Sequence, residues 1–271
     1  YGTPMALMLF PYWSEGHPSM EGLFFESSLT TPFHFLNASE VSEKPSNPVR
    51  GLNYRGFDME RGIKHLAVYN VDYYVSYTEA GAEAARLEGL TQVGVAPPWT
   101  IFELPRSSLV DVATSEPAVW AGGGDFLDPA LEWYDDVDNM DKWLVADGPA
   151  GWKRVEAVDE RLVSVEPVVG SGAVTDVVSD DHRISFTTSA VGVPHLVKVS
   201  YFPNWTAEGA EGPYRAAPSL MVVVPTREQV VLEFKNTYAE NLGMALTLTA
   251  LVGMGVYAYQ RHRRRTRADA T

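Results

Sequence analysis

A dense group of acidic and aromatic side chains lies in the segment 10–48, near the start of the chain. Carboxylates accept hydrogen bonds from sugar hydroxyls, and aromatic rings stack on the apolar face of a sugar, so this mixture is typical of a glycan-contact surface. The alternative interpretation is an irregular segment whose aromatic rings pack inward and whose acids face water. The candidate glycan contacts are Tyr12, Trp13, Glu15, His17, Glu21, Glu26 and His34.

The same acids could in principle perform catalysis. A pair of glutamates at the right separation can act as acid and base in glycoside hydrolysis, and Glu15, Glu21 and Glu26 are the candidates. Glu15 and His17 could also start a metal site with Glu21 or His34, but no His-x-x-x-His helical spacing supports one. We therefore assign no catalytic residue, no metal and no cofactor from the sequence.

Other motifs exclude several classes of site. The acidic segment 134–143 resembles a calcium loop, but an EF-hand counted from Asp136 needs glycine and glutamate where Asp141 and Asp147 stand. The glycines in 121–125 lack the lysine and the serine or threonine of a phosphate loop. The chain has no cysteine, which excludes disulfides, thiolate metal sites and cysteine nucleophiles, and it has no G-x-S-x-G nucleophile elbow.

The formal net charge of −14 is unevenly distributed along the chain. Residues 1–240 carry 16 basic and 34 acidic side chains, whereas the remaining residues carry five arginines and one aspartate. Such an acidic body repels phosphate backbones, so we expect no nucleic-acid partner.

The segment 241–260 contains no Asp, Glu, Lys or Arg. As a helix it would extend about 30 Å, the thickness of the hydrocarbon core of a bilayer. Its apolar residues lie all around the helix, which predicts one transmembrane helix, whereas the alternative is a buried core helix with a solvated tail. The residues expected in the span are Leu242, Leu246, Leu248, Leu251, Val252, Val256, Tyr257 and Tyr259.

A cluster of arginines follows this segment directly, in the tail 261–271. Under the positive-inside rule the tail is cytoplasmic and the body is extracytoplasmic. The expected localisation is therefore the cell membrane, and the bilayer is an expected partner. The cytoplasmic anchor consists of Arg261, Arg263, Arg264, Arg265 and Arg267.

Helical and strand patterns alternate in the region 1–105, after its irregular, aromatic-rich start. The segment 61–71 has helical spacing, 72–78 is typical of a strand, 79–90 is alanine-rich and helical, and 99–104 is typical of a second strand. This order predicts a small α/β layer.

Residues 106–152 are rich in Gly, Pro, Asp and Trp, and we expect an ordered connector with one short helix near 129–134, because its Trp and Leu side chains require burial. Residues 153–238 alternate apolar and polar side chains between turn residues, as in an antiparallel β-sandwich. The expected strands are 182–189, 195–205, 219–225 and 229–236, with one or two more in 153–169 and turns at 203–204, 208–213 and 225. The expected fold class is α+β: a small α/β layer, then an antiparallel β-sandwich, then one C-terminal transmembrane helix.

Four segments, 6–36, 62–78, 195–205 and 230–254, together resemble the C-terminal extracytoplasmic region of large bacterial integral membrane proteins. These proteins are similar to multi-span glycosyltransferases of the GT-C type, including the group labelled 6-pyruvoyl-tetrahydropterin synthase-related membrane proteins. The resemblance implies preceding membrane helices, catalytic acids in their early extracytoplasmic loops, and a lipid-linked phosphate sugar as donor. It transfers no catalytic residue to this chain.

The leading hypothesis is an extracytoplasmic accessory region of a GT-C-like membrane glycosyltransferase or related envelope protein. Such a region would cover the membrane site and position a glycan or lipid-linked acceptor, with upstream membrane helices of the same protein as a further partner. The alternative is a single-pass membrane-anchored β-sandwich binding module without transferase activity. A third hypothesis is a glycosidase that uses Glu15, Glu21 or Glu26.

Overall fold

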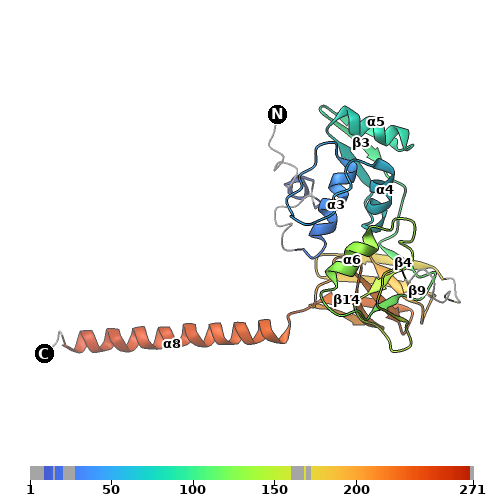
Figure 1. Ribbon diagram of the computed structural model, residues 1–271. Coiled ribbons are helices and arrows are strands. Elements are labelled where there is room, and N and C mark those ends of the chain that lie inside the picture. The colour runs from blue at the N-terminus through green and yellow to red at the C-terminus, as the bar shows by residue number, and fades with distance from the viewer. Residues whose placement is uncertain (1–8, 15, 21–27, 160–167, 169–171, 269–271) are drawn as a thin grey trace.

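The computed structural model describes residues 9–14, 16–20, 28–159, 168 and 172–268. Figure 1 shows helices and sheets gathered in one body, from which a single long helix projects. Mixed helices and mostly antiparallel strands, with one apolar helix at the C-terminal end, confirm the expected α+β class.

The N-terminal layer contains the helices α2 (Phe10–Trp13), α3 (Thr31–Val41) and α4 (Met59–Val68). The helical spacing of 61–71 predicted α4. Asp58 caps this helix, because its side chain accepts a hydrogen bond from the backbone N–H of Arg61 at 3.1 Å.

The expectation of an irregular segment over 10–48 is wrong for α3. Proline fits the first turn of a helix because its missing N–H would have no partner there, and Pro32 occupies that position. Phe33 and Leu36 then point into the core. The sequence shows no clear helical period here, because both faces of the helix carry aromatic or apolar residues.

A small three-stranded sheet confirms the expected α/β layer. Its strands β1 (Tyr73–Ser76), β3 (Trp99–Glu103) and β2 (Thr91–Ala96) are antiparallel and lie in the order β1-β3-β2. Helix α5 (Glu79–Leu87) contributes two alanines that pack against Phe102 of the central strand. Strand β2 was not expected, and its pairing with β3 is irregular where a glycine interrupts the alternation.

A seven-stranded sheet forms the centre of the body. Its order is β4-β10-β13-β12-β6-β5-β7, and β5 pairs in parallel with β6 and β7. The segment 106–152, expected as an ordered connector, supplies three of these strands and helix α6 (Leu127–Tyr134). The bounds are β4 Val110–Val112, β5 Ala118–Trp120, β6 Leu144–Val145, β7 Arg154–Val155, β10 His195–Val197, β12 Ala210–Ala216 and β13 Leu220–Pro225.

A four-stranded antiparallel sheet packs against it. Its strands lie in the order β11 (Trp205–Glu208), β14 (Gln229–Phe234), β9 (Arg183–Thr188) and β8 (Val174–Ser179). Apolar side chains from both sheets form one cluster between them, as in a β-sandwich. The buried members of this cluster are Val110, Ile184, Phe186, Val197, Trp205, Met221, Val223, Val230 and Leu232.

Two expected boundaries in the sandwich are wrong. The alternating segment 195–205 is not one strand, because β10 ends at Val197 and β11 begins at Trp205. The segment 208–213 is mostly strand rather than turn. The chain bends at Gly209, whose φ of +81° favours glycine, and passes there from the four-stranded sheet to the seven-stranded sheet, where β12 starts at the next residue.

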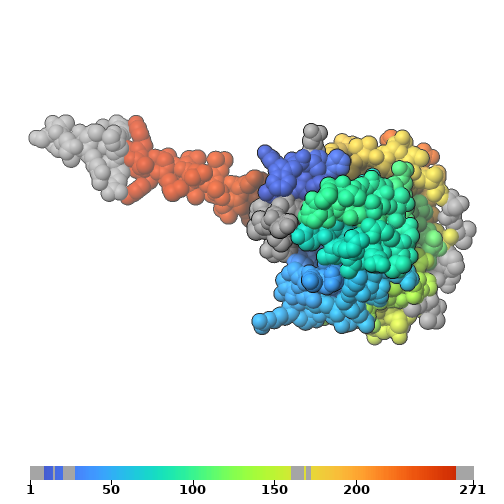
Figure 2. All heavy atoms as spheres, turned by 90° about the horizontal axis from the view of Figure 1, so that it is seen from above, coloured from blue at the N-terminus to red at the C-terminus, as the bar shows by residue number. Residues whose placement is uncertain are grey.

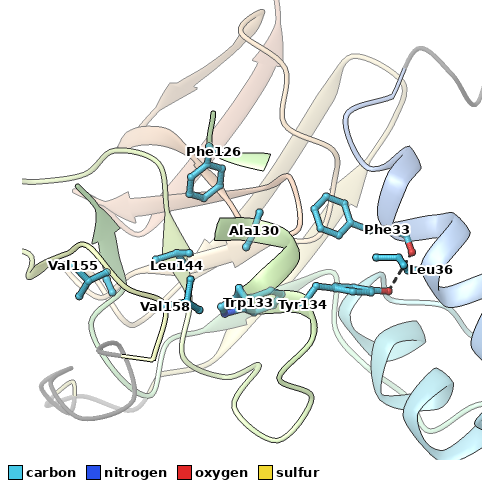
Figure 3. Close-up of a cluster of buried hydrophobic side chains, with 11 residues drawn as sticks. Phe33, Leu36, Phe126, Ala130, Trp133, Tyr134, Leu144, Val155 and Val158 are labelled. Atoms are coloured by element: carbon cyan, nitrogen blue, oxygen red, sulfur yellow. Dashed lines mark hydrogen bonds between the residues drawn. The ribbon is translucent and has the colours of Figure 1, made fainter. Parts of the chain in front are cut away.

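The helical layer and the central sheet share a hydrophobic core, shown in Figure 3. Phe33 of α3 meets Tyr134 of α6 edge to face, with ring centroids 5.2 Å apart. The hydroxyl of Tyr134 donates a hydrogen bond to the backbone oxygen of Phe33 at 3.3 Å. Trp133, expected to be buried, lies in this core with Leu144. The α/β half and the β half are therefore continuous in packing.

Helix α8 (Tyr238–Ala268) contains the expected span. Residues 238–260 form a helix long and apolar enough to cross a membrane, and no part of its most apolar window is buried against the body. The hydroxyls of Thr247 and Thr249 donate to the backbone oxygens four residues earlier, at 2.8 Å each, so they need no partner from water.

Candidate functional site

Only part of the expected glycan-contact group falls within the described residues. Tyr12 and Trp13 lie on α2 with 83% and 60% of their surface exposed. His17 is exposed and its Nδ1 donates to the backbone oxygen of Ser14. Glu15, Glu21 and Glu26 lie outside the described residues, so the hydrolysis and metal hypotheses built on them stay predictions.

His34 does not face solvent in the way a sugar contact would. It lies on α3, and its ring packs edge to face against Tyr69 with centroids 5.0 Å apart. Burial lowers the pKa of this imidazole to about 4, because a charged ring there would lose its hydration. His34 is therefore a neutral packing residue around neutral pH.

A groove of about 480 Å³ opens where the helical layer meets the central sheet. The turn before α3 and the first turn of α3 form one wall, and the start of α6 and strand β12 form the other. Most of the lining is apolar, and it includes Phe35. The lining residues are Ser28, Leu29, Thr31, Pro32, Phe35, Pro48, Val49, Asp125, Leu127 and Arg215.

Arg215 is the cation of this groove. Its guanidinium carbon lies 5.3 Å from the centre of the Phe126 ring, and its Nε donates to the hydroxyl of Ser219 at 3.1 Å. Burial lowers the pKa of the guanidinium, while the negative charge of Asp125 acts in the opposite direction. Arginine remains protonated in proteins, so the groove offers a fixed positive charge with further N–H donors.

Asp125 supplies the opposite charge at the same groove. Its side chain accepts a hydrogen bond from the backbone N–H of Leu127 at 3.0 Å, which fixes the carboxylate at the start of α6. An arginine can bind a phosphate, a carboxylate can accept hydroxyl groups, and an apolar wall can pack against a sugar face or an alkyl chain. Neither Asp125 nor Arg215 was expected from the sequence.

A second cluster of titratable groups lies between α3, α4 and α6, and its central pair, Glu40 and His65, is closed to solvent. Glu40 Oε2 lies 2.5 Å from His65 Nδ1, and Glu40 Oε1 accepts from Arg61 Nε at 2.9 Å. His65 Nε2 donates to the backbone oxygen of Tyr134 at 2.9 Å, and the His65 and Tyr134 rings stack with centroids 3.6 Å apart. Arg61 also pairs with Asp135 at 2.9 Å.

Glu40 and His65 are residue types that form catalytic acid–base pairs, but solvent and substrate cannot reach them. Glu40 and His65 are 2% and 0% exposed, and both ring nitrogens of His65 are occupied. A substrate could not reach them without separating the helices. The cluster therefore joins the helical layer to α6. Among the described residues, no group of three or more His, Asp or Glu side chains is placed to hold a metal ion.

A third polar arrangement connects the body to α8. Thr237 and Glu240 form a capping box at the start of the helix: a Glu240 carboxylate oxygen accepts from the backbone N–H of Thr237 at 2.6 Å. The same oxygen accepts from the side-chain amide of Asn204 at 2.7 Å. That amide also donates to the backbone oxygen of Lys235 at 2.8 Å. We call these four residues the helix joint.

The two N-x-S/T sequences of the chain lie at structural positions. Asn204 belongs to the helix joint and is buried. Asn37 is buried in α3, where its amide donates to the backbone oxygen of Gly62 at 3.0 Å. Neither amide can carry a glycan in the folded state, because the modification would require both the space and the donor that the fold already uses.

Comparison of the chain with protein-family models, with curated proteins and with solved structures returns no significant match.

Proposed function

We propose that this chain is the extracytoplasmic, membrane-anchored region of a cell-envelope protein, and that its groove binds a lipid-linked glycan beside the bilayer. Helix α8 supplies the anchor. The arginines at 261–267 favour a cytoplasmic position for the end of that helix, which leaves the acidic body on the outer side.

The groove suggests the class of ligand. Arg215 would bind a phosphate that joins sugar to lipid, Asp125 would accept sugar hydroxyls, and the wall around Phe35 would pack against the sugar or the first part of the lipid chain. The observation that carries the proposal is the combination of this charged and apolar groove with a helix of membrane-spanning length in one chain.

The proposed role is positioning and not chemistry. Glu40 and His65, which have the geometry of an acid–base pair, are buried and satisfied within the fold. In the setting of a GT-C-like membrane glycosyltransferase, the chain would hold a lipid-linked acceptor near a catalytic site supplied by other segments.

Photocrosslinking tests the binding proposal. The chain is placed in lipid nanodiscs with a photoreactive polyprenyl-phosphate sugar, and the crosslinked peptides are identified by mass spectrometry. We expect crosslinks in 28–35, 48–49 and 125–127, and competition by the unlabelled sugar lipid. Crosslinks confined to α8, or equally strong with a polyprenyl phosphate that lacks sugar, would contradict a glycan-binding groove.

A transfer assay separates the accessory role from the alternative of a single-pass binding module. The full-length protein is compared with a form in which residues 9–236 are deleted and the apolar helix is kept. If the body positions an acceptor, glycan transfer falls while membrane insertion is unchanged. Unchanged transfer would favour the binding module.

A further inference from the structure

We propose that α2 is a second membrane contact: the side chains of Leu9, Phe10, Tyr12 and Trp13 enter the interfacial layer of the same bilayer that α8 crosses. The inference rests on the membrane insertion of α8, which belongs to the proposed function. It adds a second contact surface, and with it an orientation of the body that the anchor alone does not define.

The exposure of α2 is the first observation. Leu9 and Phe10 are 41% and 43% exposed, and Tyr12 and Trp13 are more exposed still. All four belong to one short segment, 9–14, which contains no charged side chain. A contiguous group of large apolar side chains is costly in water, and such groups mark protein or membrane contacts.

The placement of α2 is the second observation. Figures 1 and 2 both show the segments 9–14 and 16–20, in dark blue, on the side of the body from which α8 departs. In a bilayer crossed by α8, this side of the body faces the lipid headgroups. Tyr238, the first residue of α8, is 82% exposed, and Phe202, which stacks on Phe234 at the end of β14, is 43% exposed.

The helix joint relates the two contacts. Asn204 lies in the turn before β11, and its amide holds Glu240 of α8, so the first turn of α8 is fixed to the sandwich by side-chain hydrogen bonds. A helix attached in this way cannot rotate freely against the body. The joint therefore turns one side of the body toward the bilayer, and the tilt of the body over the membrane is left to a second contact.

The chemistry of α2 favours lipid over a protein partner. Tryptophan and tyrosine concentrate at membrane–water interfaces, where an apolar ring and a polar N–H or O–H are both satisfied. Residues 1–240 are strongly acidic and would be repelled by anionic headgroups. An uncharged aromatic segment is the part of such a body that can approach those headgroups closely.

The consequence is an orientation for the groove. A body attached only through α8 could tilt over the membrane, whereas two separated contacts define its angle. Helix α3, whose first turn lines the groove, lies on the same side of the body as α2 (Figure 1). The second contact would thus hold the groove near the depth at which a lipid-linked sugar phosphate leaves the bilayer.

Depth-dependent fluorescence quenching tests this contact on the full chain. Because the chain has no cysteine, Tyr12→Cys, Leu87→Cys and Met254→Cys each give a single labelling site for an environment-sensitive fluorophore. The matched control is Leu87, which is 81% exposed on α5. Each labelled protein is placed in nanodiscs of phosphatidylcholine and phosphatidylglycerol that contain lipids with a quencher near the headgroup or deep in the acyl chain.

We expect shallow quenchers to reduce the emission at position 12 several-fold more than at position 87, and deep quenchers to act mainly at position 254. Phe10→Ser with Trp13→Ser should reduce the quenching at position 12 and leave that at position 254 unchanged. These two residues are exposed, so their replacement does not disturb the core.

The outcomes separate the two proposals. Quenching at 254 with none at 12 overturns the second contact and leaves the anchor intact. No quenching at 254 overturns the anchor, and the second contact with it. Quenching at 12 that survives Phe10→Ser with Trp13→Ser overturns the assignment of the contact to these side chains.

Discussion

The cluster around Glu40 and the groove around Arg215 both place a carboxylate near a cation, yet they differ in what remains available. In the cluster, each carboxylate oxygen of Glu40 faces a positively charged or ring nitrogen, and both nitrogens of His65 are occupied. In the groove, Arg215 makes one hydrogen bond through Nε to Ser219 and lies over an aromatic ring. The polar atoms of Glu40 and His65 make their hydrogen bonds within the fold, whereas the groove opens to solvent.

This difference shows why residue types alone do not locate a functional site. A histidine and a glutamate at hydrogen-bond distance would satisfy a search for an acid–base pair. Burial changes what they do, because a fully paired buried group stabilises the arrangement of the helices and cannot meet a substrate. An open groove with fewer titratable groups is the better candidate for binding.

The largest effect is expected from Glu40→Ala. The change leaves Arg61 and His65 without their carboxylate in a buried site, and breaking a buried ion pair in this way costs about 3–5 kcal/mol. We expect the free energy of unfolding of the body to fall by that amount in urea unfolding followed by tryptophan fluorescence. The matched control is Glu60→Ala on α4, the helix that carries Arg61 and His65, where the pair with Lys64 is solvent-exposed and little changes.

Equal losses in these two variants would contradict the structural role of the cluster. If Glu40→Ala kept the stability of the parent chain but bound ligand much more weakly, Glu40 would belong to a binding site. That result would also contradict a structural role.

The next effect is a pH dependence that comes from His34. Its pKa is lowered from 6.5 to about 4 by burial, so the unfolded chain takes up a proton in this range while the folded protein does not. Stability is therefore present near neutral pH and is lost as the pH falls from about 6.5 toward about 4, by up to about 3 kcal/mol.

His34→Gln should remove this part of the pH dependence, and His17→Gln, at an exposed position, should not. The measurement is the urea midpoint at about pH 7 and about pH 4.5 for all three proteins, a range that brackets the titration of the unfolded histidine. Parallel pH profiles for the parent chain and His34→Gln would show that His34 is not the group responsible.

The third effect concerns the groove. Arg215→Met keeps much of the side-chain volume but removes the charge, and a hydrogen bond to a charged group contributes about 1.5–3 kcal/mol. We expect at least tenfold weaker binding of a polyprenyl-phosphate sugar, about 1.4 kcal/mol or more, with a nearly unchanged urea midpoint. Binding is measured by titration in nanodiscs.

Arg227→Met is the matched control for this test, because Arg227 lies in the turn before β14 and is mostly exposed. The groove would lose its support if both variants weakened binding equally, since that would indicate a general effect of positive charge. The groove would also lose its support if Arg215→Met unfolded the protein, because Arg215 would then have a structural role like that of Glu40.

The sequence predicted the parts of the fold that have a clear period. The spacing at Ile63, Leu66 and Ala67 indicated α4, and the alternation of 229–236 indicated β14. The uninterrupted apolar segment near the C-terminus indicated a helix of membrane-spanning length. Each of these patterns is local, so the sequence contains it whether or not the rest of the fold is known.

The groove and the cluster could not be predicted in the same way, because both depend on contacts between distant segments. Arg215 meets Phe126 across the junction of β12 and α6, and Glu40 meets His65 between two helices. A weak signal for the cluster existed: Arg61 and His65 are four residues apart and therefore share a face of α4. That spacing indicated a common face but not the acid opposite.

The helix joint stands between these two regions: Glu240 and Lys235 are exposed, as the groove is, while Asn204 is buried and hydrogen-bonded, as the cluster is. Its hydrogen bonds should therefore determine geometry more than stability. Thr237→Ala with Glu240→Ala removes the capping box and the bond from Asn204. We expect an unchanged urea midpoint for the body and a broader distribution of distances between spin labels at Leu87→Cys and Tyr257→Cys, measured by pulsed electron paramagnetic resonance.

Glu233→Ala is the matched control for the joint. It removes an acid from β14, and the Glu233 side chain pairs with the Lys235 side chain and not with Asn204. Its distance distribution should be as narrow as that of the parent chain. A distribution that stays narrow in the double variant within nanodiscs but broadens in detergent would show that the membrane contact of α2 holds the body once the joint is lost. A distribution that stays narrow in both would mean that neither the joint nor α2 fixes the angle of α8.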